Sequence, residues 1–317
     1  MYKNRVHEMK KNTRLFLFAA YDKANVIDDT LLHYLNSLSN LGDIILTIDS
    51  DIDAHELSKL ESVKNIIHVK SGRHHEYDFG SYKRGFQYAQ QNNILKNYDW
   101  VYFVNDSVYG PLWDIQHILT DLESRDADLI GMIDFTNKEL PNHVQSWFVG
   151  MSQNVVKTDF FTDFINNITR KPDKTSIIFS YEVGLSQIIL HHGYKISTFA
   201  SGQDGERCHS MYEEPLEMLK SGMPFIKKLA LAKINKSALL SCYTCDETIK
   251  KIYNHAQRVY GYTMADINAR QEHKYKKIYR LTIFSIPVLT VYKKELCGSS
   301  YKICIFDKIP VVKIARS

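Results

Sequence analysis

The residues of this chain that could carry out chemistry follow apolar segments typical of buried strands. Residues 100–104 (WVYFV) form one such segment, and Asn105, Asp106 and Ser107 come directly after it. A carboxylate on the loop that leaves the carboxyl end of a strand lies where open α/β sheets bind ligands. There an Asp can hold Mg²⁺ or Mn²⁺ against a diphosphate, because phosphate oxygens and waters complete the coordination shell. We therefore expect Asn105 and Asp106 to contact a phosphate-bearing ligand, with Asp106 as the metal ligand. The alternative is that Asp106 only caps the turn into residues 109–111.

A second polar segment, residues 76–85 (EYDFGSYKRG), follows a short predicted strand and opens a helix. Gly80 would let the backbone approach a ligand closely, and free N–H groups at a helix start attract an anion. Asp78 could accept a hydrogen bond from a ribose or base, while Lys83 and Arg84 could neutralise phosphate. An ordinary capped helix with a glycine in its first turn explains the segment equally well.

Glu182 is a candidate base. It follows Ser180, which could cap a helix that is closed by Gly193. A carboxylate in the first turn is stabilised by ~0.3–1 kcal/mol through the helix dipole and stays ionised. Simple charge complementarity at a helix start is the commoner reason for a Glu in such a position.

Apolar runs alternate with helical patterns through the first two-thirds of the chain. Predicted strands cover residues 15–20, 44–48, 66–69, 100–104 and 129–133; predicted helices cover about 31–38, 82–92 and 115–124. This alternation indicates βαβ units with right-handed crossovers. Continuous apolar runs are typical of strands covered on both faces. The fold prediction is therefore α/β: a Rossmann-like, mainly parallel sheet flanked by helices. Tyr21 and Asp49 follow the first two strands, and we assign them to the same ligand.

The pattern changes beyond Asp134. Residues 144–149 read as an edge strand, 155–168 as a helix and 194–199 as a strand. We predict three parts: an α/β domain at 1–205, a helical extension at 206–272, and a basic, apolar tail at 273–317.

The tail holds a weak repeat, in which residues 279–289 are echoed by residues 301–312, each copy split by a proline. One interpretation is a pair of short strands packed on the domain. The other is a peripheral membrane contact, with apolar residues in the interface and Lys or Arg on anionic lipid.

Bulk properties exclude several classes. Hydrophobic and charged fractions of 44% and 24% over 317 residues are those of an ordinary globular protein. A formal charge of +4 does not indicate nucleic acid. The basic N-terminus lacks the apolar core of a signal peptide, and five scattered cysteines indicate a reducing, cytosolic compartment. Cys242 and Cys245 lack the second close pair that a structural zinc site needs.

Five ordered motifs resemble the rhamnan synthesis protein F family of bacterial polysaccharide glycosyltransferases. They are residues 76–85, 105–111 (NDSVYGP), 145–148 (QSWF), 181–186 (YEVGLS) with Gly193 and Tyr194, and 222–228 (GMPFIKK). The resemblance covers about residues 14–228.

The resemblance implies a GT-A-like fold and a role for each motif. Asp78, Gly80 and Arg84 would line a nucleotide-sugar site, Asp106 would match the second Asp of the metal-binding Asp-x-Asp element, and Glu182 would be the base of an inverting enzyme. We assign Gln145, Ser146 and Trp147 to the acceptor, because they lie between the donor half and the Glu182 helix. One departure stands out: Val104 or Asn105 replaces the leading Asp, which puts tight metal binding in doubt.

The expected function is transfer of a sugar, L-rhamnose from dTDP-L-rhamnose, to a lipid-linked or growing surface glycan such as lipopolysaccharide or capsule. The expected location is the cytoplasm, at the inner face of the membrane. The alternative is a non-catalytic subunit that binds a nucleotide sugar or glycan within a synthesis complex.

Overall fold

The structure is a computed structural model. It describes residues 13–135, 140–201, 211–234, 239 and 247–261 with their side chains, and residues 210, 246, 276–283, 286–295, 299–305 and 309–315 as backbone.

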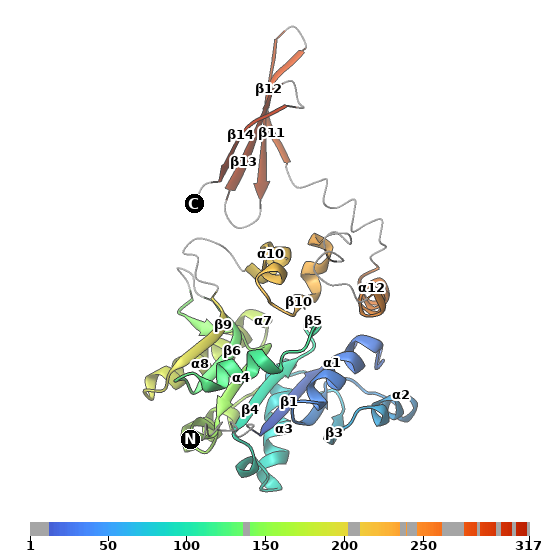
Figure 1. The fold of residues 1–317 in the computed structure, drawn as a ribbon, viewed down its shortest axis with the longest axis vertical. Helices are drawn as coiled ribbons and strands as arrows, with labels where there is room; N and C mark the ends of the chain where they lie inside the picture. The colour runs from blue at the N-terminus through green and yellow to red at the C-terminus, as the bar shows by residue number, and fades with distance from the viewer. Residues whose placement is uncertain are drawn as a thin grey trace, which may run out of the picture.

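A central sheet of eight strands organises the first two hundred residues (Figure 1). Its strands are β1 (Arg14–Ala20), β2 (Asp43–Ile48), β3 (Ile66–Ser71), β4 (Trp100–Asn105), β6 (Leu129–Phe135), β7 (His143–Val144), β8 (Phe148–Ser152) and β9 (Ile196–Ala200). The order is β3-β2-β1-β4-β8-β6-β7, with β9 paired to β6. The first four strands and the β6–β9 pair are parallel, whereas β8 runs antiparallel to both neighbours. The predicted α/β fold with a mainly parallel sheet is confirmed.

Helices cover both faces of this sheet, as the continuous apolar strands predict. Alternate residues of β1 point to opposite sides: Phe16 and Phe18 join the core beneath α1 (Asp29–Ser39) and α4 (Gln116–Ser124). Leu15 and Leu17 join the core beneath α3 (Tyr77–Gln91), α6 (Asp159–Asn166) and α8 (Gly184–His191). The remaining elements of this region are α2 (Ala54–Ser58), η1 (Lys59–Ser62), η2 (Leu95–Asn97) and α5 (Gln153–Val156).

Residues 144–149 do not form the predicted edge strand. β7 ends at Val144, and β8 begins at Phe148 and lies between β4 and β6 in the middle of the sheet. Gly150 permits this close packing, because a Cβ there would meet the Tyr102 ring at 2.5 Å. The three residues between β7 and β8 are buried, and backbone hydrogen bonds of 3.0 Å still join Gln145 to Ile133 and Trp147 to Asn105.

The helix that carries Glu182 begins earlier than predicted. Asp173, not Ser180, is the N-cap, and its side chain accepts from the Ser176 N–H at 2.8 Å. α7 (Lys174–Ile177), the π-helix η3 (Ile178–Val183) and α8 follow without a break. Gly193 then adopts a φ of 81°, as expected of a glycine that closes a helix. The helix predicted at 155–168 is likewise divided into α5 and α6, because Thr158 caps α6.

A smaller lobe packs on the end of the sheet. It contains β5 (Val108–Tyr109), paired antiparallel with β10 (Ile226–Lys227), together with α9 (Ser210–Glu213), α10 (Pro215–Lys220), η4 (Lys228–Lys233) and α12 (Asp246–Tyr260). All of these elements except α9 contribute to a separate apolar cluster that includes Tyr109, Ile226 and Ile252.

The tail forms four strands rather than the predicted two. β11 (Lys276–Ile283), β12 (Ile286–Glu295), β13 (Ser299–Ile305) and β14 (Ile309–Ala315) make an antiparallel sheet in chain order (Figure 1). The sequence repeat thus corresponds to two successive hairpins. The predicted membrane contact of the tail depends on side chains outside the described set. None of the helices that the structure describes is long and apolar enough to cross a membrane.

Candidate active site

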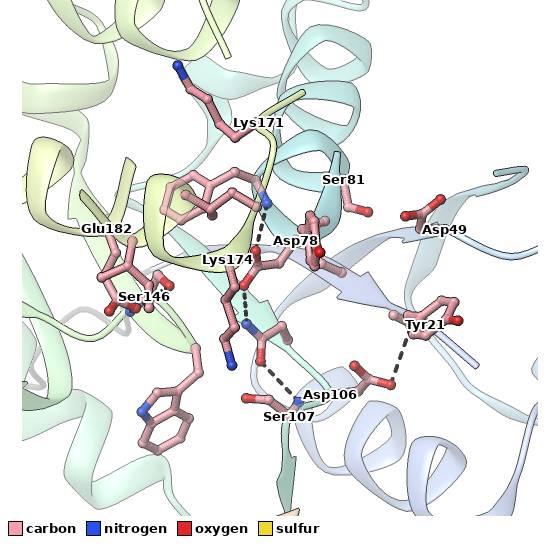
Figure 2. A pocket seen from close by; sticks show the side chains of 18 of the residues that line it. Tyr21, Asp49, Asp78, Ser81, Asp106, Ser107, Ser146, Lys171, Lys174 and Glu182 are labelled. Atoms are coloured by element: carbon pink, nitrogen blue, oxygen red, sulfur yellow. Dashed lines mark hydrogen bonds between the residues drawn. The ribbon is translucent and has the colours of Figure 1, made fainter. Parts of the chain in front are cut away.

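A cavity of about 930 Å³ opens at the carboxyl ends of β1, β2 and β4. It brings together nine of the twelve predicted site residues: Tyr21, Asp49, Asp78, Asn105, Asp106, Gln145, Ser146, Trp147 and Glu182. Figure 2 shows Glu182 and Ser146 on one side, Asp106 and Tyr21 on the other, and Asp78 between them. Parallel strands place the loops that follow them at one edge of the sheet, which explains why residues from different loops line one cavity.

Glu182 is tied to the segment that joins β7 and β8. Its Oε2 accepts from the Ser146 N–H at 2.8 Å and from Ser146 Oγ at 2.5 Å. Its Oε1 lies 3.6 Å from Nε2 of the buried His143. Burial alone would raise the pKa of Glu182, but the hydrogen bonds from His143 and Ser146 outweigh burial and lower that pKa. These side-chain partners, rather than a helix start, keep Glu182 ionised.

The predicted first-turn position of Glu182 is therefore wrong. Glu182 lies inside the π-helix η3, several residues beyond the Asp173 cap. A π-turn adds one residue to a helical turn and often occurs at functional sites.

Asp78 lies in the middle of the cavity, and its pKa is shifted in the direction opposite to that of Glu182. Its Oδ2 accepts from Asn105 Nδ2 at 2.8 Å. Burial and the charge of Glu182 raise the pKa of Asp78 to about 6. The buried Tyr82 donates from its hydroxyl to the Ser146 carbonyl at 3.0 Å.

Asp106 lies at the far side of the cavity, between the Tyr21 N–H group and the Lys228 ammonium group. Its Oδ2 accepts from the Tyr21 N–H at 3.4 Å and lies 3.6 Å from Lys228 Nζ. Burial raises the pKa of Asp106, and Lys228 offsets part of that rise.

Lys227 is a cavity residue that we did not predict. It is 6% exposed, its Nζ donates to Ser107 Oγ at 3.2 Å, and it lies 4.9 Å above the Trp147 ring. Burial lowers its pKa to about 7 despite the nearby Glu182. The only signal in the sequence was its position in the motif 222–228, which carries no chemical pattern of its own.

Three predicted donor residues do not line the cavity. Lys83 donates to the Ile168 carbonyl at 2.8 Å, and Arg84 binds Glu76 Oε2 at 2.6 Å. A Cβ at Gly80 would meet the Glu76 Cβ at 2.3 Å. Lys83 therefore ties α3 to the segment after α6, Arg84 holds the start of α3, and Gly80 gives room to the Glu76 side chain rather than to a ligand.

Basic and aromatic side chains line the mouth of the cavity. The lining cations besides Lys227 are Arg73, Arg170, Lys171 and Lys174, and the lining tyrosines include Tyr21 and Tyr77, each 49% exposed. Arg73 lies 4.8 Å above the Tyr21 ring. His75 and Tyr77 have φ values of 59° and 57°, a left-handed conformation that is costly for residues other than glycine and clusters at functional sites.

Asp49 organises this rim from beneath. Its Oδ1 accepts from the backbone N–H groups of His74 and His75 at 2.6 and 3.1 Å. The Asp49 carboxylate thus holds the loop that carries Arg73, through hydrogen bonds to the backbone of that loop.

The groups around Asp106 fit a divalent cation poorly. Asn105, in the leading position, uses its Nδ2 on Asp78 and accepts from the Ser107 N–H at 3.0 Å through Oδ1. Asp106 faces an ammonium group, which competes for the same lone pairs. Among the described residues no group of three or more His, Cys, Asp or Glu side chains could hold a metal ion. The metal at Asp106 remains a prediction.

The comparisons with known proteins agree with the resemblance of the motifs. The family model described as "Rhamnan synthesis protein F" matches residues 44–268. A curated relative, the uncharacterized protein y4gN of Sinorhizobium fredii, is 21% identical over 186 residues, which is 58% of this chain. The aligned part covers 48% of that protein, so this chain matches about half the length of its relative.

Solved glycosyltransferase structures show distant similarity. TarS 1-349 of S. aureus is 12% identical with a TM-score of 0.33, covering 94% of this chain and 99% of that one. Core-mannan synthase A of Aspergillus fumigatus, in a Mn/GDP form, is 12% identical with a TM-score of 0.32, covering 65% and 81%.

Proposed function

The chain belongs to the rhamnan synthesis protein F family, and from that premise we propose that it is an inverting glycosyltransferase of surface-polysaccharide synthesis. It moves a sugar, L-rhamnose from dTDP-L-rhamnose, to a glycan acceptor. The observation that carries this proposal is the arrangement of charge in one cavity. An ionised carboxylate, Glu182, lies on one side, and buried or rim cations lie across from it and above it.

The reaction is a single displacement. An acceptor hydroxyl bound beside Ser146 gives its proton to Glu182, and its oxygen attacks the anomeric carbon. The bond from that carbon to the diphosphate oxygen breaks, and the electron pair leaves with the diphosphate. The configuration at the anomeric carbon is inverted. His143 stabilises the Glu182 carboxylate before the transfer, because its Nε2 faces Oε1 at 3.6 Å.

The two ends of the cavity suit the two substrates. The exposed rings of Tyr21 and Tyr77 offer stacking surfaces to a nucleobase, and Arg73 beside Tyr21 offers a cation to phosphate. Gln145 and Trp147 are nearly fully buried and form the floor next to Ser146. In this proposal they shape the acceptor end by fixing Ser146, with Trp147 Nε1 donating to Gln145 Oε1 at 3.1 Å.

A donor panel tests the proposal. Purified protein is mixed with a synthetic glycan acceptor and with dTDP-L-rhamnose, UDP-, GDP- or CMP-sugars, and release of the free nucleotide is measured. We expect release from one donor, with dTDP-L-rhamnose the fastest, and a product of inverted anomeric configuration by NMR. Retained configuration would refute the role of Glu182, and a different preferred donor would refute the assignment of rhamnose.

The same assay addresses a non-catalytic subunit. That alternative is favoured by the missing leading Asp, since Asn105 is committed to Asp78. Both kinds of protein bind a nucleotide, but only an enzyme releases it from the sugar. Nucleotide binding with no release from any donor would support the binding subunit.

A further inference from the structure

We infer that this protein neutralises the diphosphate of its donor with Lys227, while Lys228 occupies Asp106, so that binding needs no divalent cation. The inference rests on the proposed function for the identity of the anion. It starts from the two adjacent lysines that end the motif 222–228.

The lysine pair is attached directly to the loop that follows β4. In the antiparallel β5–β10 pair, Lys227 lies opposite Val108. The Lys228 N–H donates to the Ser107 carbonyl at 3.0 Å. Successive residues of an extended segment point to opposite sides. Lys227 therefore enters the main cavity, and Lys228 enters a small adjoining pocket lined by Asp22, Asp28, Asp106 and His255.

Lys227 is a buried ammonium group without a carboxylate at ion-pair distance among the described residues. Its contacts are the Ser107 hydroxyl and the faces of Trp147 and Tyr212, at 4.9 and 5.9 Å from the ring centroids. Burying a charge without an opposite charge is costly. A bound polyanion would supply that charge, and the depressed pKa of about 7 agrees with a cation that lacks one.

Lys228 pairs with Asp106 and leaves the diphosphate to Lys227. Its Nζ lies 3.6 Å from Asp106 Oδ2 and 3.5 Å from His255 Nε2. His255 in turn faces Asp28 at 3.4 Å, and Arg258 binds both Asp22 and Asp28 at 2.7 Å. This network from α12 holds Lys228 against Asp106, in the position where a metal ion would have to sit.

Inorganic pyrophosphate and dTDP are the probes for this inference. Their dissociation constants are measured by calorimetry in EDTA, and again in Mn²⁺ and in Mg²⁺. We expect dTDP to bind in EDTA with an affinity within about threefold of its affinity in Mn²⁺, a difference below 1 kcal/mol. Binding that appears only with a metal would overturn the inference and leave the proposed function standing. No binding under any condition would overturn both.

Substitutions separate the two lysines. Lys227→Met should weaken dTDP binding in EDTA by roughly 10- to 100-fold, the range for losing a charge-assisted hydrogen bond. Without ligand its melting temperature should equal or exceed that of the wild type, because a buried unpaired charge is removed. Lys228→Met should free Asp106, so that Mn²⁺ now strengthens dTDP binding.

Lys220→Met is the matched control, since Lys220 lies on α10 outside the cavity and pairs with Glu217 at 2.9 Å. It should bind dTDP like the wild type in every buffer. Unchanged binding by a folded Lys227→Met protein would contradict the role of Lys227. A Lys228→Met protein that remains indifferent to Mn²⁺ would contradict the role of Lys228.

Discussion

Two carboxyl groups in one cavity differ in pKa because their partners differ. Glu182 receives hydrogen bonds from Ser146 and faces His143, which lowers its pKa. Asp78 is buried beside Glu182, which raises its pKa to about 6. Such divergence is typical of sites in which one group acts as a base and a neighbour does not. At pH 7 Glu182 is ionised and able to accept a proton.

Asp78 should make the stability of the protein depend on pH. Its folded pKa of about 6 lies above the ordinary 3.8, so the folded state binds the extra proton between these values. The extra proton on Asp78 therefore stabilises the folded state in full below pH ~4, and this stabilisation is lost as the pH rises to ~6. Asp78→Asn should remove this dependence and be more stable relative to wild type at pH 7 than at pH 4, by about 2–3 kcal/mol. Urea unfolding at both pH values measures this.

The control for Asp78→Asn is Asp121→Asn. Asp121 is mostly exposed and pairs with Arg125 at 2.6 Å on one helix face. The unfolding free energy of Asp121→Asn should differ little from that of the wild type at both pH values. Equal shifts for the two variants would show that Asp78 titrates as an ordinary carboxyl.

Short-range sequence signals located the site residues but not their contacts. A carboxylate directly after a buried strand predicted the place of Asp106 at the sheet edge. Asp78 was predicted from the helix start that follows β3, and Glu182 from a predicted helix start and the resemblance of the motifs. The partners of Glu182 are His143 and Ser146, about forty residues earlier in the sequence. The partner of Asp106 is Lys228. Such pairings depend on the folded topology. Lys83 and Arg84 illustrate the reverse error, because cations near a helix start can be engaged within the protein: Arg84 binds Glu76 at the start of its own helix, and Lys83 binds the distant Ile168 carbonyl.

At the scale of elements, the antiparallel strand β8 and the β5–β10 pair build the site. β8 carries the backbone from Ser146 and Trp147 back through the middle of the sheet, which sets Ser146 beside Glu182. β10 attaches the lysine pair to the loop after β4. Neither could be predicted from periodicity, since β8 is a short apolar run and β10 has two residues.

The opposite end of the sheet provides a stability test that leaves the site intact. Arg14 at the start of β1 binds Glu123 of α4 at 2.6 Å, and the Tyr102 hydroxyl donates to the same carboxylate at 2.6 Å. All three are buried. Glu123→Ala leaves a buried cation unpaired, so we expect a loss of about 3–5 kcal/mol of unfolding free energy.

Thermal unfolding measures this loss, at on the order of 2–4 °C per kcal/mol. The variant that remains folded at low temperature should bind dTDP as the wild type does. A weakened dTDP affinity in folded Glu123→Ala would mean that this end of the sheet is coupled to the cavity.

For the whole molecule, the sequence was sufficient for most strands and helices up to β6, but not for β8 in the middle of the sheet. Apolar runs and the spacing of Leu31, Leu35 and Leu38 correspond to β1, β2, β4, β6 and α1, because each is strongly periodic or continuously buried. The second half was harder to predict, since polar helices and short strands give weak signals. The cavity is also lined by Tyr212, Lys227 and Leu229, which lie beyond the predicted boundary at residue 205. That boundary falls outside the described residues.

Turnover by a Glu182→Gln enzyme tests the central claim most directly. The variant keeps the size of the side chain but cannot accept the proton, so nucleotide release from the preferred donor should fall by ~10²–10⁴. Its affinity for dTDP should stay unchanged. Glu217→Gln, an exposed change on α10, should turn over like the wild type. A loss of less than about tenfold in folded Glu182→Gln would contradict the assignment of Glu182 as the base.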